Sequence, residues 1–297
     1  MIKKVAFIGV GVMGSPMAKH LLEAGYQVTV YNTNPDKCRD LIEAGAVRAE
    51  SLKEVAADAD AVFTMLPTEF IVRDVLLKEG GVAEGAKPGT IFVNSSTVSP
   101  ASNVSLGEEL IARGFRFLDS PVTGSGLQAQ AATLLFIVGG EEAAYEEVKP
   151  LYDIMGKGSL YAGPQIGAGS YAKVCSNAMM AINMLSFSEA VTMAAKAGVD
   201  PEVFVKFCAG GGPQSAMADK KIGKIVKRDF SPTFRSTLMH KDTGLASNLA
   251  KELGIPTPML NLAKEMFSIA CIEGYADEDI CAVVKCYEKW AGVEVKK

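Results

Sequence analysis

Three glycines, Gly9, Gly11 and Gly14, interrupt an apolar run near the start of the chain, in the stretch KVAFIGVGVMGSPMAKHLLEAGYQVTVYN. The residues Val5–Ile8 before them are typical of a buried strand, and a helical pattern follows them. At this spacing Gly9 allows a tight turn, Gly11 lets a ligand approach the backbone, and Gly14 lets the helix pack closely on the strand. A strand that turns so abruptly into a helix constrains the chain to an α/β fold.

The rest of the first half repeats this alternation of apolar runs and amphipathic stretches. We expect strands at Val5–Ile8, Gln27–Tyr31, Ala61–Met65, Thr90–Asn94, Arg116–Asp119 and Leu134–Val138. Helical patterns between them include Pro16–Ala24, Cys38–Ala44 and Ser102–Arg113. Such alternation implies parallel strand pairing with right-handed crossovers, and therefore a doubly wound sheet of Rossmann type.

The second half differs, because no strand pattern recurs after about Gly163. A long helical pattern without proline spans Gly169–Ala197, and shorter ones follow at Pro201–Cys208, Ser215–Lys227, His240–Leu253, Met259–Glu273 and Ile280–Ala291. For a chain of 297 residues we expect two domains. Residues 1–163 form the α/β Rossmann domain, and residues 164–297 form an all-α domain joined to it by the long interdomain helix.

Composition excludes several classes of protein. The net charge of −4 does not favour binding to nucleic acid or to an anionic membrane, and polar residues break the apolar stretch Ala178–Ala195, so we expect no membrane span. Six cysteines without a CxxC pair and two histidines form no metal-ligand pattern. We therefore expect no metal site, and reduced, buried thiols in a cytoplasmic protein.

In this setting the glycine-rich turn predicts a dinucleotide site. The pyrophosphate would rest on the N-terminus of the following helix, against the residues Gly9, Val10, Gly11, Val12, Met13 and Gly14. Asn32 and Thr33 end the second strand, where an acidic residue binds the ribose of NAD and an arginine the 2′-phosphate of NADP. Since neither is present, the choice between NAD and NADP stays open. Asn34-Pro35-Asp36 is typical of a turn with a helix cap.

Several blocks, in order, resemble the β-hydroxyacid dehydrogenases, which include 3-hydroxyisobutyrate dehydrogenase, tartronate semialdehyde reductase and glyoxylate/succinic semialdehyde reductase and are 6-phosphogluconate dehydrogenase-like. The resemblance covers nearly the whole chain. The blocks are FIGVGVMGSPMAKHL, MLPTEFIVRDVL, VNSSTVSP, DSPVTGSGLQAQAATL, GAGSYAKVCSN and HKDTGLA.

The resemblance implies an NAD(P)-dependent oxidoreductase that interconverts a small β-hydroxy acid and its aldehyde or semialdehyde acid. It implies cofactor contacts at Leu66, Pro67, Thr97 and Lys241, and a dimer or tetramer assembled through the helical half. It also supports Thr123, Gly124 and Ser125 as a substrate loop. There glycine turns backbone N–H groups towards one point and two hydroxyls add donors, which suits a carboxylate.

The resemblance places the catalytic pair at Lys173 and Asn177, which project from one face of a helix at spacing i and i+4. The surrounding residues are apolar nearly all round, so we expect a largely buried helix and a polar partner for Asn177. Partial burial lowers the pKa of a lysine and suits Lys173 to general acid/base chemistry. Both residues would also contact substrate. His240 is expected to be structural, at a helix start.

The chain departs from the family pattern at several places. Asn94, Thr123, Ser125 and the segment Gln128–Ala132 leave the substrate open. Ile71 and Thr33 bear on the cofactor instead. Because Ser125 narrows the loop relative to glycine, we expect small substrates of about three to five carbons.

Two alternatives remain at this stage. An imine reductase of the same architecture replaces the lysine by another residue such as Asp or Tyr, which Lys173 argues against. A non-catalytic oligomerising descendant would lack the lysine. The glycine-rich loop at Gly210–Pro213 is explained equally well as a helix stop or as part of a pocket, and we assign it no role.

Overall fold

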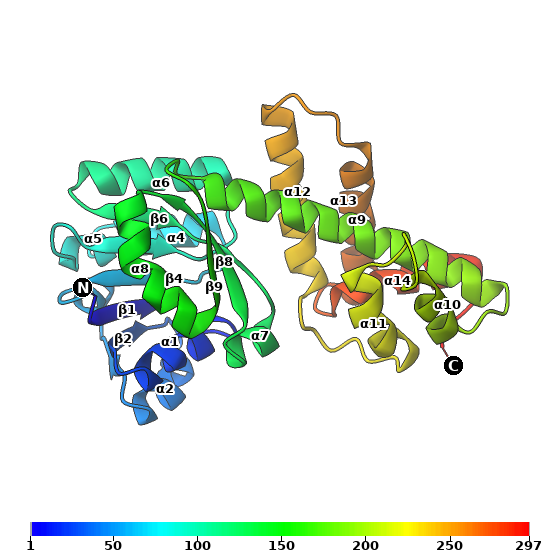
Figure 1. Cartoon of the computed structure of the whole chain (residues 1–297), viewed down its shortest axis with the longest axis horizontal. Helices are drawn as coiled ribbons and strands as arrows, with labels where there is room; N and C mark the ends of the chain where they lie inside the picture. Colours follow the sequence, from blue (N-terminus) through cyan, green and yellow to red (C-terminus); the bar gives the residue numbers. More distant parts are fainter. Residues whose placement is uncertain (1, 297) are drawn as a thin grey trace. The chain divides into compact units, whose positions relative to one another are not determined.

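The structure, a computed structural model, describes residues 2–296 and divides into two compact units after Lys173. The division falls within the long helix α9 (Ala168–Lys196), downstream of the predicted boundary at residues 163/164. The first unit is a sheet with helices, and the second is helical, as expected from the sequence (Figure 1).

The sheet of the first unit has the strand order β3-β2-β1-β4-β5-β6-β8-β7, and β9 also pairs with β8. The strands are β1 (Lys4–Ile8), β2 (Gln27–Tyr31), β3 (Val47–Arg48), β4 (Ala61–Thr64), β5 (Ile91–Asn94), β6 (Arg116–Asp119), β7 (Val122–Thr123), β8 (Leu134–Gly140) and β9 (Gly156–Gly163). The strands β1 to β6 are parallel, so their carboxyl ends share one edge of the sheet.

Helices cover both faces of this sheet, because successive strand residues point to opposite sides. One face packs against α1 (Gly14–Glu23), α2 (Arg39–Glu43) and α8 (Glu142–Met155), and the other against α3 (Leu52–Val55), α4 (Glu69–Leu77), α5 (Val82–Gly85) and α6 (Pro100–Ala112). Phe7 and Phe63 stack on the first face with ring centroids 5.7 Å apart. On the second face Ile8 belongs to the cluster of Phe92.

The predicted doubly wound, parallel sheet is confirmed for β1 to β6, but the pairing changes at the far end of the sheet. β8 runs antiparallel to β6 and β7, although it pairs in parallel with β9. The link from β7 to β8 is short and contains only α7 (Gly126–Gln130), and a short link between neighbouring strands requires antiparallel pairing. The strands β3, β7 and β9 were also not predicted, since two are only two residues long and β9 is rich in glycine and polar residues.

The second unit gathers the rest of α9 with shorter helices. They are α10 (Pro201–Cys208), α11 (Ala216–Val226), α12 (Ser236–Glu252), α13 (Pro258–Ala270), the 3₁₀ turn Ile280–Val283 and α14 (Val284–Ala291). Met184 and Val191 of α9 pack with Phe267 in its apolar core. The helix predicted to Glu273 ends at Ala270, and a π turn containing Gly274, with φ of 95°, follows it.

Helix α9 is the one helix within residues 2–296 that is long and apolar enough, by length and composition, to cross a membrane. The core helix of a globular protein passes the same test, so this is weak evidence, and Met184 and Val191 of α9 are fully buried in the protein core. The expectation that all thiols are buried is wrong at Cys175, which is exposed on this helix, and at Cys271, which is half-buried.

A buried ion pair holds the middle of the second unit. Lys221 lies 2.7 Å from one carboxylate oxygen of Asp279, and the other oxygen accepts the N–H and the hydroxyl of Thr233. Burial alone would raise the pKa of Asp279, but the charge and hydrogen bond of Lys221 and the bonds from Thr233 outweigh it and hold the pKa at about 2.

Since this pKa lies below the ordinary value of 3.8, ionised Asp279 stabilises the fold above about pH 4 and that contribution is lost as the pH falls towards 2. We expect the stability difference between the protein and Asp279→Asn to shrink by about 2 kcal/mol over this range. Urea unfolding at pH values between about 2 and 6, followed by the fluorescence of the single tryptophan, Trp290 of α14, measures it.

Asp277→Asn is the matched control, because the Asp277 side chain is 86% exposed in the same turn and pairs with Arg235 only at the surface. An equal pH dependence of the two stability differences would show that Asp279 contributes nothing specific.

Candidate functional site

The glycine-rich turn has the conformation that the sequence analysis required. Gly9 adopts φ of +90°, and a Cβ there would collide with the carbonyl of Met65. A Cβ at Gly14 would collide with the carbonyl of Gly9 and lie 2.9 Å from the ring of Phe7. These two glycines are therefore needed for the turn and for the packing of α1 on β1.

The same turn fits a dinucleotide phosphate. A Cβ added at Gly11 would meet no atom within 4 Å, so the backbone there faces open space. Among residues 2–296 no side chain caps α1, whose N-cap residue is Met13, so no side-chain acceptor from this part of the chain occupies the cap. Backbone N–H groups at a helix N-terminus bind phosphate because they carry partial positive charge.

Other predicted cofactor residues follow the neighbouring strands at the same edge of the sheet. Asn32 follows β2, and its side-chain amide donates to the carbonyl of Asn34, whose own side chain caps the 3₁₀ turn Pro35–Cys38. The turn with a cap expected there is confirmed. Thr33 is exposed at this position.

Leu66 and Pro67 follow β4, and Thr97 follows β5 after the buried residues Ser95 and Ser96. The hydroxyl of Ser96 accepts the backbone N–H of Leu66 at 2.9 Å. This bond ties together the two strand-end loops that carry these predicted contacts.

The predicted substrate loop joins β7 to α7. Gly124 has φ of +136°, and a Cβ there would lie 2.6 Å from the side chain of Leu134, so only glycine fits. The N–H of Ser125 donates to the side-chain carbonyl of Gln128 at 2.8 Å. One donor of the expected anion site is thus engaged by a residue of the segment that departs from the family pattern.

The end of that segment is strained, because Ala132 has φ of 48°. A left-handed conformation costs a residue with a Cβ on the order of 1 kcal/mol. The loop also meets the glycine-rich turn, since a Cβ at Gly126 would lie 2.5 Å from the Val12 side chain. The ring of His20 in α1 contacts the carbonyl of Ala129 in α7 at 3.0 Å. The helices that follow the two predicted binding loops are therefore in contact with each other.

Lys173 lies in the second turn of α9 and is half-buried. The expectation of a largely buried helix is wrong around it, because Tyr171, Cys175 and Met179 are exposed. An apolar composition on all sides shows only that no face is strongly polar, whereas burial depends on which neighbours are present.

Asn177, one turn after Lys173, is 4% exposed and has the polar partner that its burial demanded. Its side-chain amide donates to the carboxylate of Asp242 at 2.6 Å, and the ammonium of Lys241 lies 3.2 Å from the other oxygen. The structure thus brings together Asn177 and Lys241 through Asp242, a residue of the HKDTGLA block to which the sequence analysis gave no role. The sequence signal for such a residue was an asparagine in a helix expected to be buried, because a buried amide requires a polar partner.

The expectation that His240 stands at the start of a helix is wrong. His240 lies in the second turn of α12. Its Nδ1 is buried and has no hydrogen-bond partner among residues 2–296. The helix starts earlier because Ser236 is anchored by hydrogen bonds to residues of the distant turn that contains Asp279.

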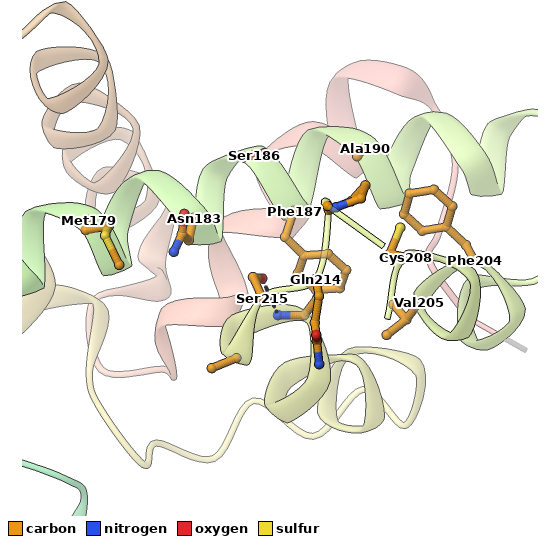
Figure 2. Close-up of a pocket in the computed structure, with 14 residues that line it drawn as sticks. Met179, Asn183, Ser186, Phe187, Ala190, Phe204, Val205, Cys208, Gln214 and Ser215 are labelled. Atoms are coloured by element: carbon orange, nitrogen blue, oxygen red, sulfur yellow. Dashed lines mark hydrogen bonds between the residues drawn. The ribbon is translucent and has the colours of Figure 1, made fainter. Parts of the chain in front are cut away.

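A cavity of about 500 Å³ in the second unit lies among α9, α10 and α11 (Figure 2). Figure 2 shows Asn183, Phe187 and Gln214 turned towards it. The loop left unassigned contributes Gly212 and Pro213 to its lining, while no predicted site residue lines it. The loop is therefore part of a cavity as well as the end of a helix.

Comparison with known proteins agrees with a nucleotide-binding unit followed by a helical one. Residues 4–167 match the family described as the NAD binding domain of 6-phosphogluconate dehydrogenase. Residues 167–287 match the NAD-binding family of NADP-dependent 3-hydroxyisobutyrate dehydrogenase. Fold and site together define an NAD(P)-dependent oxidoreductase of hydroxy acids.

The relatives narrow this class. The chain is 35% identical to 2-(hydroxymethyl)glutarate dehydrogenase of Eubacterium barkeri over 98% of its own length and 97% of the relative's. It is 35% identical to the NAD-dependent L-serine dehydrogenase of Pseudomonas aeruginosa, over 98% and 100%. A structure of Mycobacterium tuberculosis 3-hydroxyisobutyrate dehydrogenase with L-serine superimposes with a TM-score of 0.89 at 31% identity, over 97% and 99%. The chain belongs to the β-hydroxyacid dehydrogenase family.

The cofactor is therefore NAD or NADP, and the end of β2 is the place to test the choice. We expect Thr33→Arg to raise kcat/KM for NADPH relative to NADH, because a guanidinium binds a phosphate through two hydrogen bonds. Steady-state kinetics with both cofactors measures the ratio. Ala112→Arg, at an exposed position at the end of α6, is the control, and an equal ratio in both variants would place Thr33 away from the ribose.

Proposed function

We propose that the protein interconverts a small β-hydroxy acid of about three to five carbons and the corresponding aldehyde acid, with Lys173 as general acid/base. The observation that carries the proposal is the placement of Lys173 one helical turn before Asn177, whose amide is fixed by buried Asp242. The substrates of relatives support this class, since L-serine and 3-hydroxyisobutyrate both carry a hydroxyl on the β carbon.

Lys173 performs the proton step. When bound, the nicotinamide supplies or accepts the hydride at the carbon that bears the oxygen. During oxidation the neutral amine of Lys173 takes the hydroxyl proton, and during reduction its ammonium returns that proton to the carbonyl oxygen.

Asn177 orients substrate. Its amide N–H donates to Asp242, so the orientation of its side chain is fixed. Removal of a group that positions substrate lowers the rate less than removal of the proton carrier.

The Thr123–Ser125 loop binds the carboxylate. Gly124 in the left-handed region turns the neighbouring backbone, and the hydroxyls of Thr123 and Ser125 add donors. Because the N–H of Ser125 already donates to Gln128, a carboxylate takes this donor only by displacing the Gln128 carbonyl. Gln128 thereby sets how tightly the carboxylate is held.

Replacement of the proton carrier gives the first test. Lys173→Ala should lower kcat by about a hundredfold or more while the dissociation constant of the cofactor stays nearly unchanged. Asn177→Ala should show the same pattern with a smaller loss. Stopped-flow turnover and NADH fluorescence titration measure the two quantities, and near-native turnover of Lys173→Ala would refute the role.

The carboxylate site has its own test. Thr123→Ala should raise KM for an aldehyde acid much more than for the uncharged aldehyde of the same length. Gln128→Ala should lower KM for the acid by up to about tenfold, since it frees a backbone N–H for a charged acceptor. Steady-state kinetics with paired charged and neutral substrates measures both.

Gln130→Ala, an exposed glutamine in the same short helix, is the control for Gln128. If Gln128→Ala and Gln130→Ala change KM alike, or if Thr123→Ala affects both substrates equally, the loop does not anchor the carboxylate.

A panel of aldehyde acids with NADH and NADPH decides between this function and its alternatives. An imine reductase from Bacillus cereus shares the fold, with a TM-score of 0.63 at 21% identity, a likeness that bears on the fold alone. Tight cofactor binding without oxidation of NAD(P)H by any member of the panel would favour an imine reductase or a non-catalytic protein.

A further inference from the structure

A chain of buried polar side chains runs through the first unit, beneath the edge of the sheet that carries the predicted site. The hydroxyl of Thr64 donates to Asn94 at 2.9 Å, the amide of Asn94 to Asn103 at 2.7 Å, and the amide of Asn103 to the carboxylate of Asp119 at 2.7 Å. All four side chains are at most 1% exposed. Water does not compete for these bonds, so each member is held in one orientation.

This series of hydrogen bonds ends at the first turn of α9. Asp119 accepts the backbone N–H of Ser170 on one oxygen and the Ser170 hydroxyl on the other, both at 2.7 Å. Asn103 donates to the same hydroxyl at 2.9 Å. A carboxylate at the N-terminus of a helix is favoured by the free N–H groups and the dipole there.

Close backbone packing holds this end of the helix against the sheet. A Cβ at Gly169 would lie 2.6 Å from the carbonyl of Asp119 and 2.7 Å from that of Ile137. A Cβ at Gly139 would lie 2.6 Å from the carbonyl of Gln165. The helix therefore rests directly on β6 and β8, and the hydrogen bonds of Ser170 determine its position along them.

Each end of this arrangement borders a part of the proposed site. Lys173 lies three residues after Ser170, and the substrate loop begins four residues after Asp119. The side-chain carbonyl of Asn94 also accepts the N–H of Ser96, and the hydroxyl of Ser96 accepts the N–H of Leu66. The lysine, the substrate loop and two cofactor loops are thus joined through one buried set of bonds.

We propose that Asp119 and Ser170 are positioning residues, which hold the first turn of α9 so that the Lys173 ammonium meets substrate bound at the Thr123–Ser125 loop. The proposal rests on the proposed function, because it acts through the proton step at Lys173. Both side chains are at most 1% exposed, so the proposal has them act through the helix and not through contact with substrate or cofactor. Misplacement of a reacting group by about 1 Å can cost a hundredfold in rate.

Ser170→Ala is the first variant, and Ser188→Ala is its matched control. Both serines lie in α9 and are at most 1% exposed, but the hydroxyl of Ser188 donates to the carbonyl of Met184 within its own helix. We expect Ser170→Ala to lower kcat by about tenfold to a hundredfold with cofactor affinity unchanged, and Ser188→Ala to leave kcat within about twofold. Equal losses of kcat in the two variants would overturn the proposal.

A double-mutant cycle with Lys173→Ala tests whether the effect passes through the lysine. Ser170→Ala should cause no further loss of kcat in the Lys173→Ala background, since the group that it positions is already absent. A loss of the same factor in both backgrounds would overturn the positioning role while the general acid/base role of Lys173 stands. Near-native turnover of Lys173→Ala alone would instead overturn the proposed function, and the positioning role with it.

Asp119→Asn provides a second variant with nearly the same volume. One carboxylate oxygen becomes an amide nitrogen, which cannot accept a hydrogen bond, so either the bond from the Ser170 N–H or that from the Asn103 amide is lost. We expect a loss of kcat at least as large as that of Ser170→Ala, again without weaker cofactor binding. A normal kcat in folded Asp119→Asn would overturn the assignment of Asp119. If that variant does not fold, Ser170→Ala and the cycle with Lys173→Ala decide the proposal.

Discussion

The rest of the site depends on the hydrogen bonds between the carboxylate of Asp119 and Ser170. Asp119 ends β6, lies wholly out of water and accepts two hydrogen bonds from Ser170 at the start of α9. Burial raises its pKa to about 6, against the opposing effect of the hydrogen bonds from Ser170 and Asn103. Burial of a carboxylate costs stability, and in return this carboxylate fixes one position for the helix that carries Lys173.

The strands of the first half follow from local pattern. Gln27–Tyr31 and Arg116–Asp119 have the bounds that the sequence predicts, because a buried parallel strand is a short apolar run between turn residues. The glycine-rich turn is local only in part: a Cβ at Gly14 would meet Gly9 and Phe7, whereas a Cβ at Gly9 would meet Met65, which follows β4. The antiparallel β8 was not predictable in the same way, because strand direction depends on which neighbour the chain reaches.

The residues of the candidate site also fall into two groups, those that local spacing indicates and those that only the fold brings together. Residue types at fixed spacing indicate Gly9 to Gly14 and the pair Lys173 and Asn177, and family resemblance adds the loops. The partners of these residues come from far along the chain: Asp242 lies 65 residues beyond Asn177, and Ser170 lies 51 residues beyond Asp119. No periodicity links residues at such separations, so Asp242 and Asp119 received no role until the fold placed them.

The sequence by itself determined an α/β unit followed by a helical one, a dinucleotide turn, and a lysine and an asparagine one turn apart on a long helix. These properties depend on contacts within a few residues, where backbone geometry converts spacing directly into structure. The tertiary structure alone decided that Gln128 occupies the N–H of Ser125, that the helix around Lys173 is partly exposed, and that Asp119 anchors its first turn. Those features depend on which surfaces meet, and hydrogen bonds and burial across the fold are settled only when every element has packed.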